Sequence, residues 1–430
     1  MPKKWIFYLH LVKLNFYLNK YGFCPPQIKE KVNKDVNLIV VIPCFNETDL
    51  LTSLQSLNHC KLPIVNVEVI IVINASEKSS EAIKQQNIAS FNEGIKWANN
   101  INTEKLTFHF ILNNNLPKKH AGVGLARKIG MDEAVSRFDT INKNGIIVCF
   151  DADSKCDENY LVEIENHFNK HPTTPGCSIH YEHPIEGEEF EQNIYDGIIN
   201  YELFLRYYNQ ALLFCGLPYA FQTVGSSMAV KSSAYQKQGG MNKRKAGEDF
   251  YFIHKIIALG GFTNLSTTKV IPSPRISDRV PFGTGKAIGN WINDKASIYK
   301  TYDFRIWQII KEFVSIIPLL KNNEIAEIDF FNQPNSQVFV EFLKQNKFNE
   351  GLAEIRRNST DNKAFVKRFY TWFNAFRLLK AVHYLRDNQY PNQPIFEEAK
   401  TLAKTMGFYK NELTLKSLLM TYREKEKGSF

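Results

Sequence analysis

Two aspartates directly after a short apolar run are the residues of this chain best placed to do chemistry. Residues 146–150 are apolar, and Asp151 and Asp153 follow with one residue between them. Such a run predicts a buried strand, and ligands of open α/β sheets gather at the carboxyl ends of the strands. Carboxylate oxygens suit Mg²⁺ or Mn²⁺ and leave coordination positions open for phosphate. The pair predicts a metal site for a nucleotide diphosphate, although aspartates capping a surface turn would show the same spacing.

Polar groups also follow the two earlier predicted strands. Pro43, Asn46 and Glu47 come after the apolar run at residues 38–42, and Asn74 follows the next run. Turns of this kind can recognise a nucleoside base. Asn46 could also cap a helix that starts at Glu47, and Asn74 could belong only to a helix start. We expect these groups at the same edge of the sheet as the two aspartates.

Three further clusters carry charge. A basic, glycine-containing loop opens a helix that contains Arg127, and a helix start of this kind favours anions. Glu248 and Asp249 stand side by side at the start of a helical pattern, where they could do acid–base chemistry or only complement the helix dipole. Arg275 and Arg279 lie in a loop that contains glycines. It could be a mobile loop that closes over a phosphate, or an ordinary solvated loop.

Apolar strands alternate with helical patterns along the first 300 residues. The early strand-like runs are residues 38–42, 67–73, 106–112 and 146–150. The alternation predicts right-handed βαβ units and a mostly parallel sheet with helices on both faces, which is an α/β fold. From about Thr301 the pattern becomes helical and poor in strands. The expected parts are a basic segment at 1–35, an α/β catalytic domain at 36–300 and a helical accessory region at 301–430.

Charge and cysteine content narrow the class of protein. The net charge is +9, but seven lysines against one glutamate precede Asp35, so no basic face for nucleic acid is expected. Seven cysteines without a Cys-x-x-Cys spacing favour free thiols in a reducing cytoplasm. The apolar stretch from Trp5 to Leu18 falls short of the roughly 20 residues that cross a bilayer. It is expected to pack on the domain or to lie on the inner face of a membrane.

In order and spacing, these clusters resemble family 2 glycosyltransferases of the GT-A fold over about residues 36–291. The family shows a Pro-x-x-Asn-Glu-like motif after the first strand, an Ala-Arg pair in a glycine-rich helix start, an Asp-x-Asp and a later Glu-Asp. The matching residues are Pro43, Asn46, Glu47, Ala126, Arg127, Asp151, Asp153, Glu248 and Asp249. Two departures stand out. Asn74 lies where the family usually has an Asp-rich turn, and the Gln-x-x-Arg-Trp motif of processive synthases is missing.

The resemblance implies an inverting transfer of one sugar from a nucleotide-diphosphate sugar to an acceptor hydroxyl, in glycan, glycolipid or cell-envelope polysaccharide synthesis. Asp153 would hold Mn²⁺ or Mg²⁺, while Asp151 would steady the ribose and the metal's water shell. Asp249 matches the family's catalytic base, and Glu248 would lie near the acceptor. The expected donor-binding residues are Pro43, Asn46, Glu47, Asn74, Arg127, Asp151, Arg275 and Arg279.

Two other classes of protein stay open at this point. A sugar-phosphate nucleotidyltransferase could share the sheet and the metal site, but it would carry a glycine-rich loop where this chain has Pro43. A non-catalytic GT-A-like adaptor would not need intact Asp151, Asp153 and Asp249. In the helical region, cations and aromatics interleaved between residues 356 and 380 are expected to meet the acceptor or an anionic membrane, or to be structural support. The donor sugar and the acceptor, glycan or lipid-linked, are left open.

Overall fold

The chain divides into two compact units. The computed structural model describes residues 15–277, 279, 283–294 and 298–428, so the predictions made for residues 1–14 lie outside the described residues. The first unit comprises the chain up to Tyr181 together with Thr223–Pro272. The second comprises Glu182–Gln222 together with Ser273–Phe430. The expected domain boundaries at residues 36 and 301 stay predictions.

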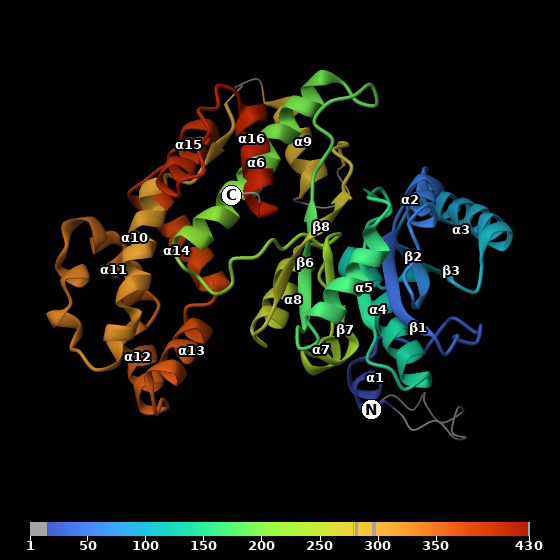
Figure 1. Ribbon diagram of the computed structural model, residues 1–430, viewed down its shortest axis with the longest axis horizontal. Coiled ribbons are helices and arrows are strands. Elements are labelled where there is room, and N and C mark those ends of the chain that lie inside the picture. The colour runs from blue at the N-terminus through green and yellow to red at the C-terminus, as the bar shows by residue number, and fades with distance from the viewer. Residues whose placement is uncertain (1–14, 278, 280–282, 295–297, 429–430) are drawn as a thin grey trace. The chain divides into compact units, whose positions relative to one another are not determined.

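The first unit is built on one eight-stranded sheet (Figure 1). Its strands are β1 (Val36–Cys44), β2 (Asn66–Ser76), β3 (Leu106–Leu116), β4 (Ile146–Cys149), β5 (Lys155–Cys156), β6 (Gly176–Tyr181), β7 (Met228–Lys231) and β8 (Thr263–Ile271). Their order across the sheet is β3-β2-β1-β4-β7-β6-β8-β5. The first four pair in parallel, as do β6 and β8, whereas β7 runs antiparallel to both neighbours and β5 antiparallel to β8. The sheet is mostly parallel, as the alternating pattern predicts.

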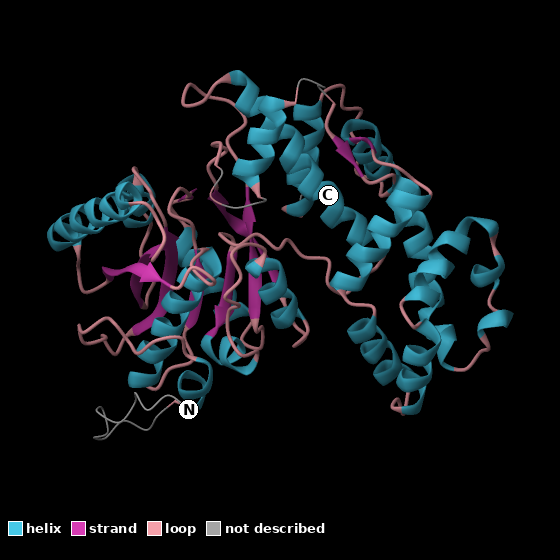
Figure 2. Cartoon of the chain, turned by 180° about the vertical axis from the view of Figure 1, so that it is seen from behind, coloured by secondary structure: helices cyan, strands magenta, loops and turns pink. Residues whose placement is uncertain are grey.

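Helices α3 (Glu81–Ile101) and α4 (Val123–Thr140) cover opposite faces of the parallel strands. A Cβ added at Gly94 of α3 would lie 2.3 Å from Phe110, and one at Gly130 of α4 would lie 2.4 Å from Val41. Val41 and His109 are both level with Ile70 of β2, so their side chains point to the same face of the sheet. Phe110 is next to His109, and neighbouring residues of a strand point to opposite faces. Phe110 and Val41 therefore face different sides of the sheet. Figure 2 shows the strands of this unit, in magenta, with helices on either side.

Helix α4 is buried along nearly its whole length because the chain before β1 covers the side turned away from the sheet. Asp132 accepts hydrogen bonds from the hydroxyls of Tyr17 (2.7 Å) and Tyr235 (2.8 Å). Glu133 accepts one from the backbone of Gln27 (2.7 Å). These buried acceptors fix the segment that includes α1 (Phe16–Tyr21) and the chain after it to the first unit.

The remaining helices of the first unit border the sheet. They are α2 (Leu50–Asn58), α5 (Tyr160–Lys170), α7 (Ser232–Lys237) and α8 (Glu248–Ile257). Helix α2 begins three residues later than predicted, with Asp49 at its N-cap, so Asn46 is not the cap. Strand β1 continues to Cys44, so Pro43 lies inside the ladder, level with Val72, and not after it.

The second unit is helical, as expected for the chain beyond Thr301. Its helices are α6 (Gln192–Phe214), α9 (Thr284–Asn293), α10 (Phe304–Ile316), α11 (Gln337–Gln345), α12 (Phe348–Arg357), α13 (Asn362–Trp372), α14 (Ala375–Asn388), α15 (Ile395–Thr405) and α16 (Leu415–Glu426). Short 3₁₀ turns lie between Ile317 and Ser336. A two-stranded ribbon pairs β9 (Lys300–Thr301) with β10 (Gln393–Pro394). Unlike the first unit, this one has no large sheet among its described residues.

Aromatic side chains form the core of the second unit. The ring of Phe313 is fully buried and packs against five other rings, with centroids between 4.9 and 6.1 Å. Those rings belong to Phe330, Phe339, Phe348, Phe369 and Phe373. Phe365 is also fully buried. Phe365, Phe369 and Phe373 are enclosed between helices of their own unit and do not face lipid. Contact of the rest of this stretch with a membrane stays a prediction.

The described residues include no helix that is long and apolar enough to cross a bilayer. The neighbouring cations Lys363, Lys367, Arg368 and Lys380 are exposed. Their exposure fits both the structural-support interpretation and the membrane interpretation, so it does not separate the two.

A buried charge network joins α16 to α6 within the second unit. Glu202 is fully buried and accepts hydrogen bonds from Arg423 (2.7 and 2.8 Å), Arg206 (2.8 Å) and His183 (2.9 and 3.0 Å). Arg206 also pairs with Glu426. Burial alone would raise the pKa of Glu202, but its cationic and hydrogen-bonding neighbours lower it well below the ordinary value. The last helix is thus anchored by charge as well as by packing.

Candidate active site

The two aspartates lie where β4 reaches the edge of the sheet. The strand ends at Cys149, and Phe150 still donates a backbone hydrogen bond to β1 (3.1 Å). Asp151 and Asp153 follow, and both are partly exposed. Ser53 of α2 donates to the backbone oxygen of Asp151 (3.1 Å). The apolar run therefore ends as the sequence predicts, with two carboxylates at the surface of the first unit.

Arg127 connects the first aspartate to the later carboxylate pair. Its guanidinium donates to Asp151 from Nη2 (2.6 Å) and to Glu248 from Nη1. The Arg127 side chain is only 4% exposed, and that of Glu248 only 2%, whereas that of Asp151 is 35% exposed. Burial opposes the charge of Arg127, but its two carboxylate partners raise its pKa above the ordinary value. A permanent buried cation therefore holds two motifs that are far apart in the sequence.

Glu248 and Asp249 form the first turn of α8. Gly247 before them has a φ of +68°, a left-handed conformation that glycine adopts without strain. Asp249 is partly exposed and accepts backbone hydrogen bonds from Phe250 (2.7 Å) and from Gly225. Burial raises the pKa of Glu248 to about 7 and also raises that of Asp249, against the opposing effect of Arg127. One carboxylate is thus paired inside the protein, while its neighbour is fixed near the surface.

Gly225 was not predicted as a site residue, yet it makes room for the buried cation. A Cβ at this position would lie 2.4 Å from Nη1 of Arg127. At the start of α4, a Cβ at Gly124 would lie 2.3 Å from the backbone oxygen of Arg244 and 3.0 Å from Cβ of Glu248. The two glycines let α4 and the chain on either side of β7 approach each other closely. Gly225 belongs to no motif, so no pattern in the sequence points to it.

Asn87 of α3 is a second residue that sequence reasoning missed. Its side chain is fully buried and bridges the ends of three parallel strands. Its amide oxygen accepts from the backbone of Asn46 (2.9 Å), and its amide nitrogen donates to the backbone oxygen of Asn74 (3.0 Å) and to the side chain of Asn114 (2.8 Å). Asn87 therefore sets the geometry of the region where a nucleoside base was expected.

The four residues predicted around that base differ in exposure. Pro43, Glu47 and Asn74 are buried, while Asn46 is partly exposed. Asn46 has a φ of +49°, which asparagine tolerates better than most residues. Among the four, its side chain is therefore the one best placed to reach a ligand. The others shape the turn from within the first unit.

Arg275 and Arg279 belong to the second compact unit. The backbone nitrogens of both are held by serine hydroxyls two residues earlier, at 3.3 and 3.4 Å. Residues 278 and 280–282 of the same loop lie outside the described residues. The role of the two arginines in donor binding stays a prediction.

The carboxylates at the sheet edge fit a divalent cation that also binds phosphate. Asp151 and Asp153 supply hard oxygen ligands, and both are partly exposed. No cluster of three or more His, Cys, Asp or Glu side chains suited to a metal occurs in the described part of the chain. Mg²⁺ is commonly held by one or two carboxylates together with substrate phosphates, so the pair suits a metal that arrives with a nucleotide diphosphate.

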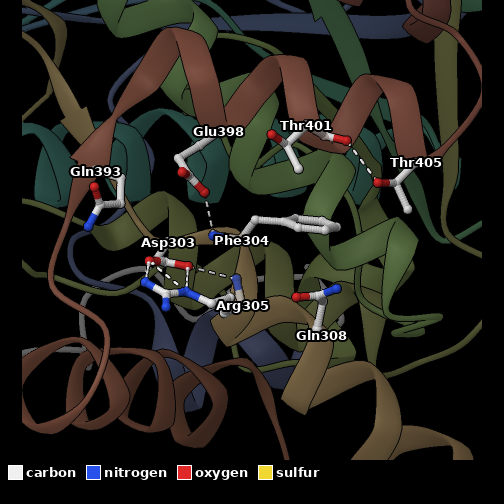
Figure 3. A pocket seen from close by; sticks show the side chains of 8 residues that line it. All are labelled: Asp303, Phe304, Arg305, Gln308, Gln393, Glu398, Thr401 and Thr405. Atoms are coloured by element: carbon white, nitrogen blue, oxygen red, sulfur yellow. Dashed lines mark hydrogen bonds and ion pairs between the residues drawn. The ribbon is translucent and has the colours of Figure 1, made fainter.

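A hollow of about 500 Å³ lies in the second unit, at the start of α10 and beside α15 (Figure 3). Glu398 accepts a backbone hydrogen bond from Phe304 (2.5 Å) there, and Asp303 pairs with Arg305 (2.6 Å). Figure 3 shows the Phe304 ring beside Thr401 of α15. None of the site residues predicted from the sequence lines this hollow.

Comparisons with known proteins identify the class of residues 39–236. Residues 39–236 match the family model described as glycosyl transferase family 2. No curated protein matches the chain. The solved structure of S. aureus TarS 1-349 in complex with UDP-GlcNAc matches with a TM-score of 0.39 and 13% identity, over 88% of this chain and 95% of that chain. Mannosyltransferase PcManGT from Pyrobaculum calidifontis, in complex with GDP-Man and Mn²⁺, matches with a TM-score of 0.33 and 13% identity, over 96% and 90%.

At these TM-scores the two structures say nothing about the ligands of this chain. The family match is different in kind, because it covers the strand-end motifs with Asn46 and Glu47, the helix with Arg127, and the Asp-x-Asp with Asp151 and Asp153. Residues 39–236 are therefore a domain of glycosyl transferase family 2.

Proposed function

We propose that the chain transfers a single sugar, with inversion, from a nucleotide-diphosphate sugar to an acceptor hydroxyl, and that a divalent cation assists. The observation that carries this proposal is the position of Arg127 between Asp151 and Glu248. It brings the expected donor carboxylates and the expected catalytic carboxylates to one place in the first unit. A non-catalytic adaptor would have no need of this arrangement.

The donor diphosphate would bind at Asp151 and Asp153. Mn²⁺ or Mg²⁺ held there would neutralise the charge that develops on the leaving diphosphate. Arg127 donates to Oδ1 of Asp151 and holds that carboxylate in place. Held in this way, Asp151 would bind the ribose and the metal's waters. We assign Arg275 and Arg279 to the phosphates as further cations.

Asp249 is the proposed general base. Its carboxylate is partly exposed and is fixed by two backbone donors, whereas that of Glu248 is buried and already paired with Arg127. The raised pKa of Asp249 moves its basicity toward neutral pH, where a base both exists in the ionised form and accepts a proton effectively. Glu248 would then align its neighbour and border the acceptor.

The base of the nucleotide would lie beside Asn46 at the ends of β1 and β2. Pro43, Glu47 and Asn74 would shape this subsite from inside the unit, and Asn87 would hold its geometry. The amide of Asn46 offers both a donor and an acceptor, which suits the edge of a base.

We place the reaction in the assembly of a glycan, a glycolipid or a cell-envelope polysaccharide, in the cytoplasm or at the inner face of a membrane. Transfer of one sugar at a time is favoured because the motif of processive synthases is missing from the sequence. The acceptor is a hydroxyl of a glycan or of a lipid-linked saccharide.

The test is a donor screen with the full chain. Common nucleotide sugars are incubated with the protein with and without Mn²⁺, and release of the nucleotide diphosphate is measured. We expect consumption of one donor class that EDTA stops and that Asp249→Asn reduces at least about 100-fold. Asp387→Asn, at an exposed pair with Arg386, is the matched control and should leave the rate unchanged. Release of inorganic diphosphate from a nucleoside triphosphate and a sugar phosphate would instead identify a nucleotidyltransferase, and activity of neither kind would refute the proposal.

A further inference from the structure

Two cysteines that are far apart in the sequence touch each other beside the Asp-x-Asp segment. The sulfurs of Cys60, just after α2, and Cys156, in β5, are 3.6 Å apart. Cys60 is 6% exposed and Cys156 is partly exposed, so a small reagent can reach the pair from the side of Cys156. All seven cysteines are free thiols in this structure. This contact is therefore a pair of reduced thiols at van der Waals distance.

The pair lies at the end of a set of contacts between α2 and the chain that follows β4. Ser53 donates to the backbone oxygen of Asp151 (3.1 Å), and Ser56 accepts from the backbone nitrogen of Cys156 (2.9 Å). The thiol of Cys60 reaches the backbone oxygen of Asp157 (3.6 Å). Side chains on one face of α2 and just beyond its end thus hold residues 151–157 at three points.

We propose that Cys60 and Cys156 are a redox-modification site, at which a peroxide converts the two thiols into a disulfide that ties α2 to the segment carrying Asp151 and Asp153. The consequence for catalysis rests on the proposed function, in which these aspartates bind the donor. The formation of the disulfide does not rest on it.

Hydrogen peroxide, as the oxidant, converts the two thiols into a disulfide in two steps. The thiolate of Cys60 attacks one peroxide oxygen, the O–O bond breaks, and after protonation the products are a sulfenic acid and water. The thiol of Cys156 then attacks the sulfenic sulfur, forming the S–S bond and releasing a second water. Two thiols are oxidised and one peroxide is reduced. A hydrogen bond from Cys156 lowers the pKa of Cys60, against the effect of burial.

The geometry allows bond formation with a small movement. The sulfurs must approach from 3.6 Å to about 2.05 Å, a shift of about 1.5 Å that side-chain rotation and a slight movement of a two-residue strand can supply. Residues 151–157 would then be held covalently at one end instead of by hydrogen bonds alone. A structural metal is not an alternative occupant, because the described residues provide no third ligand of the required kind here.

The test uses the reduced full chain treated with hydrogen peroxide and then digested without reductant. We expect a peptide cross-link between Cys60 and Cys156, a fall from seven free thiols to five, and recovery of all seven with dithiothreitol. Cys60→Ser and Cys156→Ser should each abolish the cross-link. Cys24→Ser removes a partly exposed thiol of the same unit and is the matched control that should keep it. If Cys60→Ser does not fold, Cys156→Ser, at the more exposed partner, decides the same point.

Hydrogen exchange tests the effect on the donor segment without any assumption about the reaction. Amides within residues 151–157 should exchange about threefold or more slowly in the oxidised protein, and those of the Cys156→Ser variant should not respond to peroxide. Absence of the cross-link, or a cross-link between other cysteines, would overturn the site. A cross-link with unchanged exchange would overturn its coupling to Asp151 and Asp153. Failure of the chain to bind any nucleotide diphosphate would refute the proposed function alone.

Discussion

Replacement of Asp249 by asparagine should remove catalysis while leaving the fold and the donor site in place. Asp249 accepts backbone hydrogen bonds from Phe250 (2.7 Å) and Gly225, and the amide oxygen of asparagine can keep the one from Phe250. The structural cost of Asp249→Asn should therefore be small, about 1 kcal/mol or less. Loss of a general base typically lowers a rate by about 10²- to 10⁴-fold, or roughly 3 to 5 kcal/mol in activation free energy. The loss should appear in kcat, with donor affinity within about threefold of the wild type.

Glu248→Gln is the comparison that separates the two neighbouring carboxylates. Glu248 is buried and neutralises part of the charge of Arg127, so the neutral amide weakens a charge-assisted contact in the interior. Arg127 keeps its second partner, Asp151, which limits the cost to about 1 to 3 kcal/mol of folding stability. We expect this variant to lose stability more than Asp249→Asn and to lose kcat less.

Single-turnover transfer, titration with nucleotide diphosphate and Mn²⁺, and urea unfolding measure the three quantities for both variants. If Asp249→Asn retains transfer within about threefold of the wild type, Asp249 is not the base. If it weakens nucleotide binding as much as Asp153→Asn does, the carboxylate acts on the donor and the assignment of roles is wrong.

Three further predictions concern single charges. Asp153→Asn should weaken binding of nucleotide diphosphate about tenfold or more with Mn²⁺ present and much less with EDTA; an equal loss in both titrations would contradict a metal role. Arg127→Met leaves Glu248 buried without its cation and should cost about 3 kcal/mol of folding stability near pH 7. Because the pKa of Glu248 is about 7, this cost should grow by up to about 1.4 kcal/mol per pH unit as pH rises and the carboxylate ionises. Urea unfolding at pH 6.5 and 8 measures this, and a loss independent of pH would refute it. Arg423→Met should cost about 3 kcal/mol of folding stability and raise the midpoint pH of acid unfolding. The pKa of Glu202 is lowered in the folded state, so the ionised Glu202 stabilises the fold above pH 4.5. This stabilisation is lost as pH falls through the folded pKa. An unchanged acid midpoint would show that Arg423 does not stabilise the charged form.

The parallel strands could be predicted because their residues are almost all apolar. Residues 38–42 and 67–73 are apolar except for Glu68, and in the structure every one of them is buried. Runs of this kind fit a sheet that helices cover on both faces. The start of α2 was misplaced because Asn46 and Glu47 look like helix-start residues, whereas the chain first makes a left-handed turn at Asn46 and enters the helix after Asp49.

Helix α4 shows a different limit of sequence reasoning. Its apolar residues do not follow one stripe, since the helix is enclosed on all sides and its charged residues are paired in the interior. Asp132 and Glu133 look like surface charges in the sequence, yet they bind the chain before β1. The aromatics of α13 show a related limit, because amphipathic spacing indicates an apolar face without saying whether protein or lipid covers it.

The strand-end rule could predict that Asp151 and the turn after β1 share an edge, because parallel strands deliver their carboxyl ends to the same side. It could not predict that Arg127 would reach both Asp151 and Glu248, which are 24 and 121 residues away from it. Gly225 and Asn87 are common residue types outside any motif. Their roles follow from close approach and from a buried amide bridge, which only tertiary structure creates.

The buried cluster of Arg127, Asp151 and Glu248, taken as a whole, indicates a role in geometry more than a gain in stability. The attraction in a buried ion pair often does not exceed the free-energy cost of desolvating the two charges. Replacing both partners by apolar groups is therefore often neutral or stabilising. Arg127 has two carboxylate partners that differ in exposure, with Glu248 inside and Asp151 open to a ligand on its outer side. One rigid guanidinium therefore fixes the distance between Asp151 and the turn that presents Asp249. In the proposed reaction Asp151 acts on the donor and Asp249 on the acceptor, so a side chain that sets their separation would serve catalysis even where the whole cluster adds little stability.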